Sequence, residues 1–178
     1  CCGCRWYRYG VHWYKTFQAL SMKKATLISA LAAFLIDQIS KIIVVFYLDL
    51  KTLLFIEVFP PLLNFSMAWN YGVNFGLFSS EGGAQRLFLI LFALLASAVV
   101  IYWVVREPTT KIGLVSAGLL IGGALGNASD RLFYGAVADF LNMSCCGIRN
   151  PFAFNLADTS IFFGVIGFII LGTPPKKS

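Results

Sequence analysis

Two aspartates near the C-terminal end of the chain are the residues best suited to chemistry. Asp139 follows the third of four apolar segments, and Asp158 stands at the start of the fourth, 19 residues later. If these segments are antiparallel helices, the loop between them brings the two carboxyl groups together. Two carboxyls a few ångströms apart share a proton, because both cannot ionise cheaply. Such a pair can activate water with one carboxylate and donate a proton from the other, which is the chemistry of aspartic proteolysis.

Other polar side chains stand inside or at the ends of apolar segments. Asp37 and Lys41 are four residues apart, so they share a helix face and can pair; we expect a structural pair that orients its helix. The third segment ends with Asn127, Asp130 and Arg131, and an arginine can clamp a carboxylate or a lipid phosphate. Because an intramembrane charge is costly unless it is paired or hydrated, each of these residues marks a functional hypothesis.

The residues alone leave two functions open. Carboxylates such as Asp37, Asp130 and Asp158 could instead relay protons or cations across a membrane. A transporter would be expected to show an internal repeat, and the two halves of this sequence show none. A bundle whose charges only anchor helices explains poorly why the polar blocks gather near one membrane face.

Competing chemistries have little support in the sequence. His12 is the only histidine, so no serine–histidine or cysteine–histidine pair is available. The sequence contains neither a zinc-type cluster of cysteine and histidine nor a glycine-rich nucleotide loop. We therefore expect no metal and no cofactor.

The composition places these residues in a membrane protein. The chain has 178 residues, of which 58% are hydrophobic and 12% are charged, whereas soluble domains carry about 25% charged residues. A soluble fold of this size cannot cover so much apolar surface. A net charge of +6 is compatible with nucleic-acid binding. In so apolar a chain, however, Lys and Arg more often mark cytoplasmic loops and lipid headgroup contacts, so we expect no nucleic-acid partner.

Four apolar segments predict the fold class, an α-helical integral membrane protein with a bundle of four transmembrane helices. They cover residues 25–48, 86–105, 112–133 and 154–172, close to the roughly 20 residues that a crossing needs. Basic residues flank them on one side if all four cross: Lys23, Lys24, Arg106, Lys111, Lys176 and Lys177. This bias predicts cytoplasmic termini and places residues 49–85 and 135–153 outside.

Local patterns add detail to this bundle. Gly118, Gly122 and Gly126 form a ridge of small residues that predicts close helix packing. Apolar and polar residues alternate over 64–71, which predicts a half-buried strand at the membrane surface. Residues 1–21 are rich in aromatic and basic residues; we interpret them as an extension outside the catalytic domain, 22–178.

Five blocks of the sequence together resemble the lipoprotein signal peptidases, also called signal peptidase II. In the family's order they are Asp37-Gln-Ile-Ser-Lys41, Asn70-Tyr-Gly72-Val-Asn-Phe-Gly76, Gly122-Gly-Ala-Leu-Gly126-Asn127-Ala-Ser-Asp130-Arg131, Val137-Ala-Asp139-Phe140 and Phe154-Asn155-Leu-Ala-Asp158. Each block alone is a weak signal, but the ordered set is specific. Asn74 departs from the pattern, because the family usually has a small residue there.

The resemblance implies an architecture and an activity. The expected fold has four transmembrane helices with cytoplasmic ends, a small extracytoplasmic β-cradle and a short periplasmic helix. The expected activity is that of an aspartyl endopeptidase of the bacterial inner membrane with its active site near the periplasmic face. It removes the signal peptide from a prolipoprotein by cutting before a cysteine that carries diacylglycerol. Globomycin-type cyclic peptides inhibit such enzymes by occupying the substrate site.

The resemblance also assigns roles to individual residues. Asp139 and Asp158 become the catalytic pair. The residues expected to shape the active site and contact substrate are Asn70, Gly72, Asn127, Asp130, Arg131 and Asn155. The loop that contains Cys145 and Cys146 would cover the site.

Overall fold

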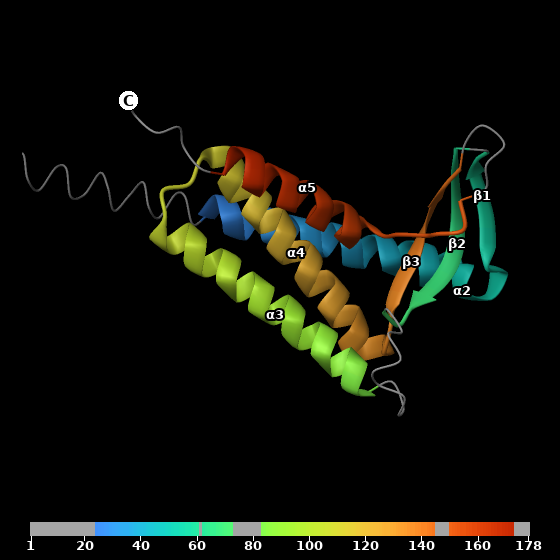
Figure 1. Cartoon of the computed structure of the whole chain (residues 1–178). Coiled ribbons are helices and arrows are strands. Elements are labelled where there is room, and N and C mark those ends of the chain that lie inside the picture. The colour runs from blue at the N-terminus through green and yellow to red at the C-terminus, as the bar shows by residue number, and fades with distance from the viewer. Residues whose placement is uncertain (1–23, 61, 73–82, 145–149, 173–178) are drawn as a thin grey trace, which may run out of the picture.

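The structure is a computed structural model that describes residues 24–60, 62–72, 83–144 and 150–172. These residues form a set of long helices with a small sheet at one end (Figure 1). Several predictions concern residues outside the described ranges: the N-terminal extension with Lys23, the segment with Asn74 and Gly76, Cys145 and Cys146, and Lys176 and Lys177.

Among the described residues, three helices are long and apolar enough to cross a membrane. The first runs over Lys24–Tyr47 and finishes as a π-helix, η1, over Ile42–Tyr47. The others are α3, Gly83–Arg106, and α4, Lys111–Tyr134. A fourth apolar helix, α5, covers Leu156–Leu171 and has 16 residues. The predicted segments are therefore all helical, while three of them have the length of a membrane span.

Helix α4 is the centre of the helical part. Its ideal Cβ positions show why glycine recurs along it: at Gly122 a Cβ would lie 2.2 Å from the carbonyl oxygen of Ala30 in the first helix. At Gly126 it would lie 2.9 Å from Oδ2 of Asp37. The predicted glycine ridge is thus confirmed as a surface for close packing, and it brings the polar end of α4 against Asp37.

The opposite end of α4 is fixed to the end of α5. The Thr110 side chain caps α4 by accepting from the Gly113 amide at 3.0 Å, and its hydroxyl donates to the Leu171 carbonyl. The Thr110 amide also donates to the Gly172 carbonyl at 3.0 Å. Helices α4 and α5 therefore lie antiparallel (Figure 1), and Ala157 at the start of α5 lies against Gly123 and Gly126 of α4.

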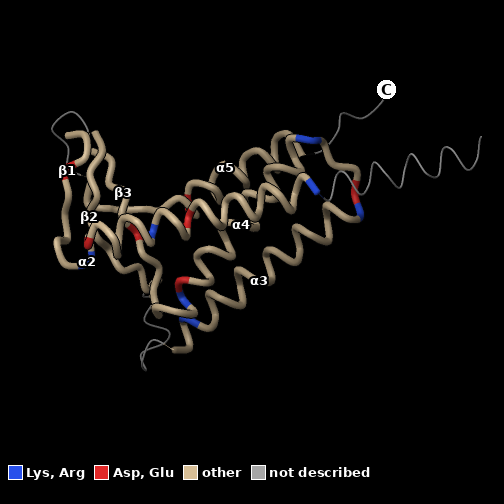
Figure 2. The backbone as a smooth tube through the Cα atoms, turned by 180° about the vertical axis from the view of Figure 1, so that it is seen from behind, with Lys and Arg blue, Asp and Glu red and all other residues tan. Residues whose placement is uncertain are grey.

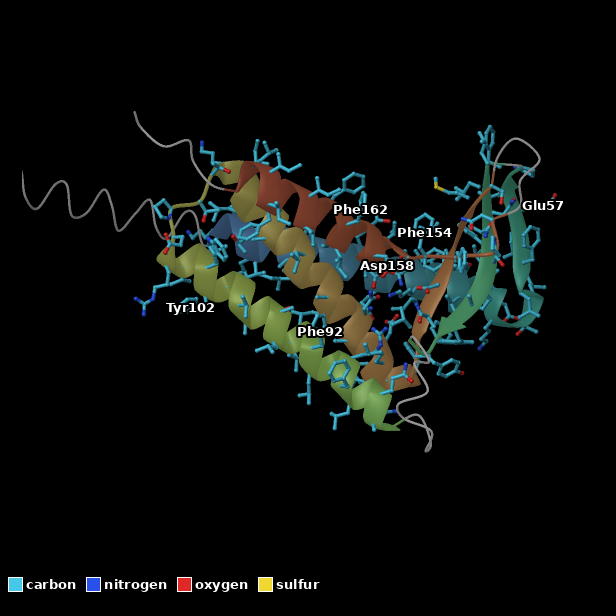
Figure 3. The ribbon with its side chains drawn as sticks, viewed as in Figure 1. Glu57, Phe92, Tyr102, Phe154, Asp158 and Phe162 are labelled. Atoms are coloured by element: carbon cyan, nitrogen blue, oxygen red, sulfur yellow. The ribbon has the colours of Figure 1, made fainter. Side chains whose placement is uncertain are left out.

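Helix α3 packs on α4 and leaves the rest of its surface open. Ser97 is the only buried residue of this helix. Phe92 and Tyr102, which are labelled in Figure 3, are 61% and 63% exposed. In water such a surface is unfavourable, so this helix fits a lipid environment.

The sheet has three antiparallel strands in the order β1-β2-β3. They cover Phe55–Phe59, Leu63–Asn70 and Val137–Met143, and a short helix, α2, covers Leu50–Leu53. Strand β2 confirms the strand predicted over 64–71. Strands β1 and β3 are additions that the residue pattern did not predict, and together the three form the small open sheet expected from the resemblance.

A small apolar core joins the sheet to the end of the first helix. It consists of Val44, Val45, Leu50, Ala138 and Phe140, with partly buried side chains of the strands packed against it. Because Ala138 and Phe140 belong to β3, this core fixes the strand residue between them, Asp139.

Charged positions are concentrated toward the ends of the helices (Figure 2). Lys and Arg positions lie at the end farthest from the sheet, where α3 finishes with Arg106 and α4 starts with Lys111, and others lie nearer the sheet. Acidic positions occur mainly toward the sheet. The distribution leaves a mostly uncharged stretch of helix between the two ends.

Candidate active site

One asparagine joins the two predicted catalytic aspartates. Asn155 is the N-cap of α5, and its Oδ1 accepts from the Asp158 amide at 2.9 Å while Asp158 Oδ2 accepts from the Asn155 amide at 3.3 Å. The same side chain donates from Nδ2 to Asp139 Oδ1 at 2.6 Å. A capping box thus orients Asp158, and its cap residue also reaches Asp139 in β3. In Figure 3, Asp158 lies at the junction between α5 and the sheet.

Asp139 is buried and bonded on both of its carboxyl oxygens. Strand pairing places it opposite Ala68 of β2, two residues before Asn70. Asn70 Nδ2 donates to Asp139 Oδ2 at 3.1 Å, which complements the bond from Asn155 to Oδ1. The side chain is therefore held in one orientation by two neutral amides.

The environment of Asp139 favours its protonated form. Burial is the largest cause and the negative charge of Asp158 is the next, and together they raise the pKa of the Asp139 carboxyl to about 6. The hydrogen bonds from Asn70 and Asn155 lower this pKa, as does the charge of Lys41, but less strongly.

Asp158 has a different environment. It is half-buried, whereas Asp139 is only 3% exposed. Asn127 of α4 donates from Nδ2 to Asp158 Oδ1 at 2.8 Å and accepts from Asn155 Nδ2 at 3.3 Å. The two carboxyls are thus unequal, with the better-hydrated one on the helix and the buried one on the strand.

An unequal pair of this kind can perform acid–base hydrolysis. The more exposed carboxylate can take a proton from water, and the buried, protonated carboxyl can donate to a carbonyl oxygen. Within the described ranges, no group of three or more His, Cys, Asp or Glu side chains could hold a metal ion.

Arg131 stands beside this pair on the same turn as Asn127. Its Nη1 donates to the Asn127 carbonyl at 3.2 Å, while its buried Nε has no hydrogen-bond partner among the described residues. A donor of this kind can bind a carbonyl or ester oxygen of a substrate.

Gly72 serves a conformational purpose in the structure. Its φ of +101° is unfavourable for other residues, and a Cβ would lie 2.6 Å from Cδ1 of Leu89. Its amide donates to Asn70 Oδ1 at 2.9 Å, which orients the asparagine that binds Asp139.

The predicted pair of Asp37 and Lys41 forms, but a third residue joins it. Lys41 Nζ lies 2.7 Å from Asp37 Oδ2 and 2.7 Å from Asp130 Oδ2. Both carboxylate side chains are fully buried. Asp130, which the resemblance placed among the residues that shape the active site and contact substrate, therefore belongs to a buried network with the first helix.

Gln38 was not singled out from the sequence, although it stands in the first matched block. Its Nε2 donates to Asp37 Oδ2 at 3.1 Å and to Asp130 Oδ1 at 3.0 Å. A polar residue next to an intramembrane aspartate was the available signal.

Comparisons with known proteins agree with this arrangement. A family model described as "Signal peptidase (SPase) II" matches residues 29–173. The lipoprotein signal peptidase of Rhodopseudomonas palustris is 34% identical over 157 residues, covering 85% of this chain and 94% of the relative. That of Methylorubrum extorquens is 39% identical over 151 residues, covering 83% and 84%.

Solved structures of bacterial membrane enzymes have the same fold. Two of them are 28% identical in sequence and superpose with TM-scores of 0.64 and 0.67. Each comparison covers 82% of this chain, and 85% and 90% of the respective solved chains.

Proposed function

Because the chain belongs to the signal peptidase II family, we propose that it is a membrane aspartyl endopeptidase that cleaves the signal peptide from diacylglyceryl-modified prolipoproteins. The cut falls on the N-terminal side of the lipid-bearing cysteine. The observation that carries the aspartyl assignment is the Asn155 side chain, which bonds to Asp139 and to the Asp158 amide.

The different environments of the two carboxyls suggest different roles for them, one as general base and one as general acid. Ionised Asp158 takes a proton from water, and the oxygen of that water attacks the scissile carbonyl carbon. Protonated Asp139 donates its proton to the carbonyl oxygen as the tetrahedral intermediate forms. When this intermediate collapses, the C–N bond breaks, Asp158 gives its proton to the leaving amine, and Asp139 recovers its own from the hydroxyl group.

The supporting residues fit the same reaction. Asn70 is exposed at the end of β2 while it holds Asp139, so it can also reach the substrate backbone. The Nε of Arg131, for which the described residues provide no acceptor, is a donor for a substrate oxygen. Asn127 and Asn155 orient the carboxyls through hydrogen bonds. Asp130 accepts from the amide of Ala138, the residue before Asp139.

The membrane placement follows from the apolar helices and the basic residues. In this proposal all four helices cross the bacterial inner membrane, with both termini cytoplasmic and the site near the periplasmic face. The rings of Trp69 and Tyr134 lie 6.1 Å apart where the sheet meets α4, and such aromatic residues favour the membrane–water interface. Water can then reach the carboxyls while the acyl chains of the substrate stay in lipid.

A proton or cation relay fits the structure less well. A relay needs carboxylates distributed across the depth of the membrane. Here Asp37 and Asp130 share one lysine, and the two proposed catalytic carboxyls are linked through Asn155. The carboxylates therefore form a compact group at the sheet end of the helices.

Cleavage of a lipid-modified substrate tests the proposal. The purified chain in lipid should convert a diacylglyceryl-modified prolipoprotein to the shorter form in a gel-shift assay, and globomycin should block it. Asp139→Asn and Asp158→Asn should each abolish the conversion. Glu57→Gln is a matched control, because Glu57 is an exposed carboxylate on β1 of the same sheet. Retained cleavage by either aspartate variant would refute the catalytic pair.

A further inference from the structure

Lys41 lies between two buried carboxylates that come from different helices. Its Nζ is 2.7 Å from Asp37 on the same helix and 2.7 Å from Asp130 on α4. The lysine side chain is 3% exposed and both carboxylates are 0% exposed. Gln38 Nε2 also donates to both carboxylates. An ammonium with two carboxylates inside a membrane helix bundle is costly to bury, so its arrangement calls for a specific explanation.

Each carboxylate also accepts a bond from one backbone amide. Asp130 Oδ2 accepts from the amide of Ala138 at 3.2 Å. Asp37 Oδ1 accepts from the amide of Ala157 at 2.9 Å. Both contacts are buried, and both alanines have almost no exposed surface, 2% and 0%.

The positions of these two alanines are the central observation. Ala138 immediately precedes Asp139 in β3, and Ala157 immediately precedes Asp158 in α5. The two bonds therefore fix the peptide groups from which the proposed catalytic side chains start. The strand and the helix are separate in sequence, and Lys41 joins their two anchors.

We propose that Lys41 is a positioning residue for the peptidase reaction, because it holds together the two carboxylates that anchor the backbone before each catalytic aspartate. The inference rests on the proposed function and extends it from the carboxyl pair to its support. Lys41 does not touch the reacting atoms. It acts through Asp37 on the α5 side and through Asp130 on the β3 side.

The physical reason is the behaviour of the two carboxylates without the cation. Without Lys41, two buried like charges would share the single amide group of Gln38. They would separate or take up a proton, since like charges in a buried site cannot both remain ionised cheaply. Either response moves or weakens the acceptors of Ala138 and Ala157, and a shift of about 1 Å in reacting groups can cost about 100-fold in rate.

Thr26 provides a matched control for ordinary helix packing. It lies on the same helix as Lys41, and its buried hydroxyl donates to the Leu114 carbonyl of α4 at 3.0 Å. It therefore joins the same two helices, but near the start of α4 and not near the catalytic pair. Its loss should affect folding without changing the geometry of the carboxyls.

The test compares Lys41→Met with Thr26→Val in lipid, with rates normalised to the folded fraction measured by thermal unfolding. Wild type should cleave a synthetic diacylglyceryl-modified prolipoprotein. Lys41→Met should lose roughly 100-fold in kcat with a KM within about threefold of wild type, while Thr26→Val keeps kcat within about threefold. Equal normalised kcat values for the two variants would overturn the positioning role. Absence of cleavage by wild type would instead refute the proposed function.

A second pair of variants tests the anchor directly, including the case where Lys41→Met does not fold. Asp37→Asn keeps an oxygen that can accept from the Ala157 amide, and Asp37→Leu removes it. The kcat of Asp37→Asn should therefore lie within about threefold of the wild-type value. The kcat of Asp37→Leu should lie about tenfold or more below it. Equal kcat in these two variants would show that the anchor does not position Asp158.

Discussion

Replacing the buried carboxyl of Asp139 should abolish cleavage and stabilise the folded protein at neutral and alkaline pH. Asp139 is 3% exposed, and its pKa is raised to about 6, from an ordinary value of 3.8, first by burial and then by Asp158. The folded state thus favours the protonated form. This carboxyl supports folding at acid pH, and the support is lost as the pH rises through about 6. Asparagine has the same shape and never ionises.

The magnitude follows from the pKa and the hydrogen bonds. A rise of about two units corresponds to about 3 kcal/mol at alkaline pH, where the carboxyl is ionised in both states. Both oxygens of Asp139 accept from amide donors, so an asparagine side chain in its place would present its own NH₂ to one of them. Losing that bond costs about 1 kcal/mol. The net gain for Asp139→Asn is therefore about 2 kcal/mol at about pH 8 and close to zero at about pH 4.5.

Thermal unfolding of the purified protein in one detergent at several pH values measures this difference. For a chain of this size, a gain of about 2 kcal/mol raises the midpoint by roughly 4–8 °C. The increment of Asp139→Asn over wild type should grow steadily between about pH 4.5 and about pH 8. Glu57→Gln, on the exposed strand, should show no such trend. A constant increment, or a destabilised Asp139→Asn at alkaline pH, would refute the assignment of Asp139 as the buried, proton-holding carboxyl.

Three further predictions concern the same geometry. In the proposed mechanism Asp139 donates a proton, so turnover should fall as the pH rises above about 6. Lys41→Met should move this fall to higher pH, because the charge of Lys41 lowers the pKa of Asp139. An unchanged pH–kcat profile in Lys41→Met would contradict the electrostatic link. Asn155→Ala should lower the free energy of unfolding by about 1 kcal/mol, because α5 loses its N-cap. It should also lower kcat by roughly 100-fold or more, because Asp139 and Asp158 each lose a hydrogen bond to the Asn155 side chain. If Asn155 were only structural, kcat normalised to the folded fraction would stay unchanged. Gly122→Leu should prevent the first helix from packing on α4, because even a Cβ would lie 2.2 Å from a backbone oxygen. Gly83→Ala should give a normal yield of folded protein in size-exclusion chromatography, because no atom of the described residues lies within 4 Å of its added Cβ.

Much of the fold could be predicted from the sequence because its signals are local. Helix-length apolar runs located the four helices to within a few residues, and alternation found β2. The glycine ridge correctly predicted close packing, because small residues at a four-residue spacing share one helix face. Spacing also predicted the pair of Asp37 and Lys41.

The parts that the sequence did not reveal depend on contacts between distant segments. Strand β3 is buried on both faces over most of its length, so it shows no alternation and reads as the tail of a helix. Asp139 was accordingly expected in a loop. The second partner of Lys41, Asp130, lies on another helix. Residue spacing within one helix cannot predict a contact between two helices.

The hydrogen-bond donors around each carboxylate explain how Asp37 and Asp130 can differ in purpose from Asp139 and Asp158. Asp37 and Asp130 share the ammonium group of Lys41, and each also accepts a hydrogen bond from a backbone amide. Among the described residues, the donors to the Asp139 carboxyl are the neutral amides of Asn70 and Asn155. Neutral donors orient a carboxyl without fixing its charge, so a proton can enter and leave it during a reaction. The placement of one lysine, Lys41, therefore distinguishes Asp37 and Asp130 from the proposed catalytic pair, Asp139 and Asp158.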